Sequence, residues 1–160
     1  MRHGGLRFDP PADFTIDQTM VSLRAPPPTS GDPRVMQRQT AIRPSLIVHR
    51  RDVGDTALEV LAGEVTAELV ASIGGLTGLS TESFAFTDGA TGLIVGFDFA
   101  AAEVMSARQF HALRKDGPLL TTLTLTVDKL SLNEAGRAKW LTMLSSAVPD
   151  ATDTAPGGLT

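Results

Sequence analysis

Apolar and polar residues alternate with a period of two in the second half of the chain. Because successive side chains of a strand point to opposite faces of a sheet, this alternation predicts strands with one buried face. The apolar positions of two such strands are Leu93, Val95, Phe97 and Phe99, and Leu119, Leu123, Leu125 and Val127, with Thr122, Thr124 and Thr126 opposite the second set.

Turn residues join these stretches into two antiparallel hairpins. Asp88-Gly89 and the Lys-Asp-Gly-Pro run at 115–118 are turn signals of the kind that connects neighbouring strands. We therefore predict a four-stranded meander and two earlier strands. The meander strands are predicted at 80–87, 90–100, 104–114 and 119–127, and the earlier strands at 20–24 and 44–51.

Two helices are predicted, at 58–73 and about 132–147, and each follows a capping-box sequence. In these boxes the hydroxyl of Thr56 or Ser131 would accept from the backbone amide three residues later, where a glutamate returns a bond to the cap. Gly74 and Gly75 would end the first helix. In the first predicted hairpin, Gly89 and Gly92 are predicted as turn or bulge positions. The apolar stripes expected against the sheet are Val60, Leu61, Val65, Leu69, Val70 and Ile73, and Trp140, Leu141, Leu144 and Ala147.

This order of elements predicts an α+β fold, an antiparallel meander packed by helices in an αβα sandwich. We expect one domain over residues 1–148. It would contain a proline-rich loop at 25–44, where repeated prolines exclude a central strand. The segment 149–160 is predicted to be a flexible tail because it carries little apolar surface.

Composition narrows the function classes. The 160 residues include no cysteine, and 14 Lys and Arg stand against 18 Asp and Glu, giving a formal charge of -4. A chain without clustered cations is a poor candidate for nucleic-acid binding, and without thiols it forms no disulfide or thiolate metal site. Residues 1–12 have no apolar run typical of a secretory signal, and no apolar stretch is long enough to span a bilayer. A cytoplasmic location is the default expectation, since the absence of cysteine is compatible with any redox compartment.

No set of residues predicts catalysis, a cofactor or a metal. The histidines His3, His49 and His111 show no metal-ligand spacing, and His49 with Asp52 is an acid–base candidate for which a solvated strand end is the favoured interpretation. The glycines from Gly74 to Gly78 follow the predicted helix, whereas a phosphate loop must precede one. We therefore expect a non-enzymatic protein.

The ordered set of short motifs resembles the DcrB-like family with the Mog1/PsbP-like fold, which includes the Eag-type chaperones of type VI secretion effectors. The resemblance covers about residues 6–147. Its pieces include Phe-x-x-Pro at 8–11, Asp-x-Thr at 17–19, Ile-Val-x-Arg at 47–50, the leucine-rich helix, Arg-Gln-Phe at 108–110, Leu-Thr-x-Thr at 123–126 and the Trp-containing helix at 140–146.

This resemblance implies a protein-binding module, a chaperone or adaptor for an apolar segment of a secreted effector, and a homodimer. One sheet face would accept the polypeptide partner. Alternatives are a small-ligand pocket between sheet and helix, a hydrolase site near His49 and Asp52, and a self-associating structural domain. The candidate partner-binding residues are Met105, Arg108, Gln109, His111, Leu113, Thr122 and Thr124.

Overall fold

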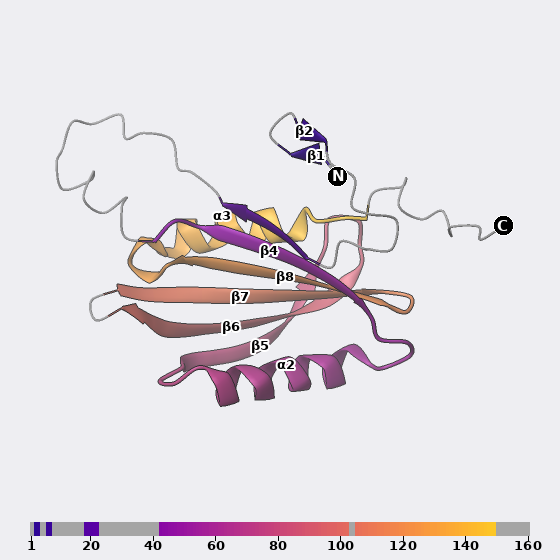
Figure 1. Ribbon diagram of the computed structural model, residues 1–160, viewed down its shortest axis with the longest axis horizontal. Coiled ribbons are helices and arrows are strands. Elements are labelled where there is room, and N and C mark those ends of the chain that lie inside the picture. The colour runs from indigo at the N-terminus through magenta and orange to yellow at the C-terminus, as the bar shows by residue number, and fades with distance from the viewer. Residues whose placement is uncertain (1, 4–5, 8–17, 23–41, 103–104, 150–160) are drawn as a thin grey trace.

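The computed structural model describes residues 2–3, 6–7, 18–22, 42–102 and 105–149. A six-stranded sheet dominates it, with strand order β3-β4-β8-β7-β6-β5 and antiparallel pairing throughout (Figure 1). A separate two-stranded sheet pairs β1 (Arg2–His3) with β2 (Leu6–Arg7). The strands of the large sheet are β3 (Gln18–Ser22), β4 (Ser45–Asp52), β5 (Thr77–Ala85), β6 (Thr91–Ala102), β7 (Met105–Asp116) and β8 (Leu119–Asp128).

The predicted α+β class and the four-stranded meander are confirmed, since β5 to β8 follow one another both along the chain and across the sheet. Both earlier strands are also present. They extend the sheet beyond β8, because β4 pairs with β8 and β3 pairs with β4. Residues 25–41 of the predicted proline-rich loop and residues 150–160 of the predicted tail lie outside the described residues.

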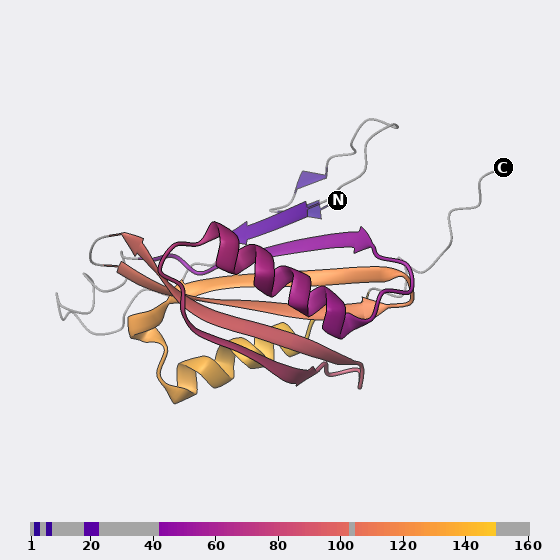
Figure 2. The ribbon, with the colours of Figure 1, turned by 90° about the horizontal axis from the view of Figure 1, so that it is seen from below.

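One helix lies on each face of the sheet (Figure 2). These are α2 (Leu58–Ser72) and α3 (Glu134–Ser145), the latter preceded by the short 3-10 helix η1 (Lys129–Ser131). Neighbouring strand residues face opposite sides, and the buried residues divide accordingly into two clusters. The α3-side cluster is Phe84, Phe86, Ile94, Phe110, Ala112, Leu123, Leu125, Val127 and Leu144, and the α2-side cluster is Leu61, Ala62, Val95, Leu113 and Leu120.

Both helices begin later than the capping boxes predict. Ala57, not Thr56, is the N-cap of α2, and it makes no side-chain capping bond. For α3 the N-cap is Asn133, whose side chain accepts from the amide of Gly136 at 2.8 Å, while Ser131 belongs to η1. Asparagine caps a helix as well as serine does, so the residue next to the first helical turn takes the role.

The predicted stripe of α2 is wrong at two positions. Leu61 is buried, and Val65 and Leu69 pack against the α2-side cluster, but Val60 and Val70 are 53% and 58% exposed. The stripe of α3 is confirmed, but Trp140, whose ring we expect to be largely buried against the sheet because it is the stripe's largest apolar side chain, is only half-buried. Its members Trp140, Leu141, Leu144 and Ala147 all belong to or pack against the α3-side cluster.

Gly92 is a strand residue at a close approach of two backbones, not the predicted turn or bulge. A Cβ atom at this position would lie 2.3 Å from the carbonyl oxygen of Leu113 and 2.7 Å from the ring of Phe86. Glycine is therefore the residue that allows β6 and β7 to pair here under the Phe86 ring.

A buried arginine joins the ends of the two hairpins. The guanidinium of Arg114 donates to Asp88 at 2.6 Å and to Asp116 at 2.7 Å, and it lies 5.0 Å from the ring centroid of Phe86. The hydrogen bonds to Asp116 and Asp88 raise the pKa of Arg114. The bond between Arg114 and Asp88 also lowers the pKa of the Asp88 carboxyl. The ion pairs thus fix the β5–β6 turn against the end of β7.

Candidate functional site

A chain of side-chain hydrogen bonds crosses β7 and β8 on the α2 side of the sheet. Gln109 donates through Nε2 to the hydroxyl of Thr126 at 2.7 Å, and its Oε1 lies 3.0 Å from Nε2 of His111. The second ring nitrogen of His111, Nδ1, lies 3.1 Å from the hydroxyl of Thr124. A ring stack on Phe97, with centroids 5.7 Å apart, holds the imidazole from its face.

A neutral imidazole satisfies the whole chain. The Oε1 atom of Gln109 can only accept, so Nε2 of His111 carries a proton. The hydroxyl of Thr124 can donate or accept, and toward the neutral ring it donates to Nδ1. Burial lowers the pKa of His111 to about 4, which keeps the ring neutral at physiological pH. His111 is therefore a fixed part of the sheet surface, positioned by its neighbours on both strands.

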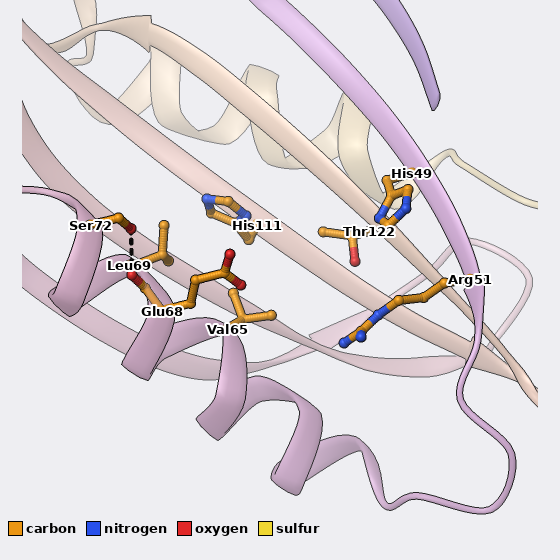
Figure 3. A pocket seen from close by; sticks show the side chains of 8 residues that line it. All are labelled: His49, Arg51, Val65, Glu68, Leu69, Ser72, His111 and Thr122. Atoms are coloured by element: carbon orange, nitrogen blue, oxygen red, sulfur yellow. Dashed lines mark hydrogen bonds between the residues drawn. The ribbon is translucent and has the colours of Figure 1, made fainter. Parts of the chain in front are cut away.

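Beside this network a cleft of about 360 Å³ lies between α2 and the sheet. Figure 3 shows side chains of α2 on one side of the cleft and side chains of β4, β7 and β8 on the other. Its lining residues are His49, Arg51, Val65, Glu68, Leu69, Ser72, His111 and Thr122. Strand pairing accounts for the sheet side, because His49 of β4 stands directly opposite Thr122 of β8.

The cleft combines an apolar wall with charges at its margin. Val65 and Leu69 form the apolar part, and the Glu68 carboxylate points from α2 toward the sheet (Figure 3). Arg51 reaches from β4 toward α2 and pairs with Glu64 at 3.8 Å, a long and exposed contact. Such a pair is readily exchanged for a ligand group, since exposed ion pairs contribute roughly 0–1 kcal/mol.

The predicted partner-binding residues divide between the two faces of the sheet. Gln109, His111, Thr122 and Thr124 share the α2 side, as period two requires, and His111 and Thr122 line the cleft. Leu113 is on the same side but buried in the core beneath α2. The side chain of Met105 lies outside the described residues.

Arg108 was grouped with these residues wrongly, because it faces the α3 side. There it pairs with Asp98 at 3.2 Å, and its guanidinium lies 5.3 Å from the ring centroid of Phe110. Lys129 reaches the same carboxylate at 2.9 Å. Arg108 therefore belongs to an ion-pair cluster on the opposite surface.

His49 and Asp52 do not form the acid–base pair considered above. His49 lines the cleft, whereas Asp52 falls on the other face of β4 by alternation, and its carboxylate accepts from the amide of Gly54 at 2.9 Å. No group of three or more metal-ligating side chains occurs within the described ranges.

Next to the cleft, part of the α2-side sheet surface lies outside the core cluster under α2. We call it the open strip, and it consists of Met20, Ile47, Thr122, Thr124 and Thr126. Met20 is 61% exposed, and the other members are half-buried. Met20 pairs with Ile47, and Ile47 pairs with Thr124, so an apolar row continues directly into the threonines.

Comparison with known proteins identifies the fold and no family. No protein-family model matches the chain, and no curated protein is significantly similar to it. A solved structure does match, that of PA94 from Pseudomonas aeruginosa, a protein of unknown function. The match has a TM-score of 0.63 and 16% sequence identity and covers 94% of this chain and 95% of that one. Neither helix in the described part of the chain has the length and hydropathy that crossing a bilayer requires.

Proposed function

We propose that this chain is a non-enzymatic protein-binding module, a chaperone or adaptor that accepts an apolar segment of a polypeptide partner on the open strip. The observation that carries the proposal is Met20, 61% exposed and continuous with Ile47 and a row of threonines outside the core. A large apolar side chain in that setting favours burial by a partner.

The chemistry of the open strip suits an apolar helix or strand with small polar residues. Each threonine offers a methyl group for apolar contact and a hydroxyl that can donate or accept. Thr124 and Thr126 are already held by His111 and Gln109, so the surface is ordered before a partner arrives. Pre-ordering reduces the entropy lost on binding.

The family assignment belongs to the same proposal. A Mog1/PsbP-like fold, DcrB-like membership and an Eag-type chaperone role are supported by the order of motifs along the chain. The antiparallel sheet between two helices and the near full-length match to a bacterial structure bear on the α+β class alone. A homodimer in the cytoplasm is the corresponding expectation for assembly and location.

A peptide-binding measurement tests the open strip. The probe is a fluorescein-labelled helical peptide of alanine, leucine and serine with glutamine at both ends, titrated with the protein. We expect binding that weakens at least about tenfold in Met20→Glu, because a carboxylate would have to be buried in apolar contact. The control is Leu130→Glu, which places the same charge at an 85% exposed leucine of η1 and should bind normally. Absence of peptide binding, or equal binding by both variants, contradicts the proposal.

The cleft supports a second candidate function, binding of a small ligand between sheet and helix. Its 360 Å³ can hold a small organic molecule, and its lining mixes apolar and charged groups. A thermal-shift screen tests it, because a ligand at 100 times its dissociation constant adds about 2.7 kcal/mol of stability. A hit belongs to the cleft if Ser72→Met, which adds bulk to the α2 side of the lining and lies outside the open strip, removes the shift. A screen without hits argues against this candidate.

A further inference from the structure

Helix α2 is apolar on two opposite sides. Its inner side packs on the sheet through Leu61, Val65 and Leu69. A second group of apolar residues points away from the sheet, and at about 100° per residue these fall within a sector roughly 100° wide. We call this sector the outer arc, and it consists of Val60, Gly63, Ala67, Val70 and Ala71, all of them exposed.

The outer arc is unlike the exposed side of the other helix. On α3 the exposed side carries Glu134, Lys139 and Thr142 with two alanines among them. The outer arc contains no charged or polar side chain, and it exposes the two valines by more than half. A helix that is apolar on both sides is typical of one buried on both sides, so the outer arc has the composition of a contact surface.

Charge at its borders indicates what covers it. By helical spacing Glu59 lies along one edge and Glu64 along the other, whereas Glu68 points toward the sheet. The helix contains no lysine or arginine. Within the described residues Glu64 has one ion pair, the long 3.8 Å contact to Arg51. The outer arc is thus an apolar surface between two acidic edges.

The acidic edges of the outer arc favour some binding partners over others. A second copy of α2 would bring carboxylates against carboxylates, which is unfavourable. An anionic lipid surface is repelled in the same way. A helix whose apolar face is flanked by lysine or arginine meets an opposite charge along each edge. Gly63, Ala67 and Ala71 have little or no side chain, so a partner helix can approach at the short end of the usual interaxial range of about 8–10 Å.

We propose that the outer arc of α2 binds an apolar helix of a polypeptide partner that carries lysine or arginine on both flanks of its apolar face. This surface is distinct from the open strip, and the inference does not rest on the function proposed above.

Two synthetic helical peptides test it, with the same alanine- and leucine-rich face and either lysine or glutamate on the flanks. Anisotropy titrations with the full chain should show binding of the lysine peptide that weakens as salt rises, because exposed charges are screened. The glutamate peptide should bind at least tenfold more weakly. Ala67→Lys, which places bulk and like charge in the centre of the outer arc, should reduce binding of the lysine peptide at least tenfold.

The matched control is Ala138→Lys, which makes the same substitution at an exposed alanine of α3 and should leave binding unchanged. Circular dichroism confirms that both variants are folded. Three results would overturn the proposal: no binding of the lysine peptide, equal binding of the two peptides, or normal binding by Ala67→Lys. Sedimentation showing a dimer that Ala67→Lys dissociates would assign the outer arc to a second copy and also overturn it.

Discussion

Replacing His111 with glutamine should flatten part of the pH dependence of stability. His111 is 9% exposed, and burial lowers its pKa to about 4 from an ordinary value of 6.5. The unfolded chain therefore takes up a proton at this residue between pH 6.5 and 4, whereas the folded chain does not. A histidine held neutral in this way contributes stability that is fully present above pH 6.5 and is lost as pH falls toward 4.

The size of the effect follows from the two pKa values. Each pKa unit corresponds to about 1.4 kcal/mol, so the complete difference is about 3 kcal/mol. Most of it develops in a mildly acidic range, where integration between pH 7 and pH 5 gives a loss of about 2 kcal/mol. The bond from Nε2 to Gln109 is already made by the neutral ring, so protonation does not add it.

Urea unfolding of the wild-type protein and of His111→Gln at several pH values measures the effect. Glutamine keeps a polar side chain of similar length and does not titrate. At pH 7 the variant should be less stable, since it loses the stack on Phe97, but the stability gap should shrink by about 2 kcal/mol by pH 5. Other titrating groups cancel in the difference. A gap that is independent of pH, or an NMR titration placing the pKa of His111 near 6.5, would refute the reasoning.

Two further predictions concern the packing of the hairpins. Gly92→Ala should destabilise the protein by roughly 1–3 kcal/mol or more, because its Cβ would overlap the carbonyl of Leu113, whereas Gly63→Ala, with open space around the new methyl group, should stabilise it by about 1 kcal/mol. Thermal unfolding of the two variants measures both changes in stability. Equal changes in Gly92→Ala and Gly63→Ala would contradict the close approach of the backbones at Gly92. Arg114→Met should cost roughly 2–4 kcal/mol by denaturant unfolding, since it removes a buried guanidinium from two carboxylates, while Arg51→Met at an exposed 3.8 Å pair should cost about 1 kcal/mol or less. Similar losses of stability in Arg114→Met and Arg51→Met would show that burial of the arginine does not determine the cost of removing it.

The strands were predictable because their signals are local. Alternation fixes which residues share a face, and Asp88-Gly89 fixes where the chain reverses, so the hairpin follows from a few neighbouring residues. The helix starts were less predictable, since Asn133 and Ser131 both suit a cap and the choice depends on where η1 ends. Pairing of β4 with β8 joins segments distant in the chain, and no local pattern specifies it.

The candidate site was predictable only on the sheet side. Alternation places Gln109 and His111 together and excludes Arg108, so the error at Arg108 came from grouping consecutive residues of one strand. The contribution of α2 to the cleft, through Glu68 and Ser72, depends on how the helix docks. Val70 directly follows Leu69 in the sequence, and at about 100° per residue it turns away from the buried stripe into the outer arc, so apolar composition alone does not identify the packed side of a helix that is apolar on two sides.

The hydrogen-bond network separates what stabilises the sheet from what remains available to a partner. His111 and Gln109 form hydrogen bonds with each other and with two threonines. A ligand that replaced one of these bonds would leave the displaced partner without a hydrogen bond, at a cost of about 1–3 kcal/mol for each buried group. Met20 holds no such role and is exposed. Affinity at the open strip should therefore come mainly from apolar contact with Met20 and Ile47 and with threonine methyl groups. It follows that Met20→Glu should weaken binding while leaving stability almost unchanged, and that His111→Gln should act first on stability.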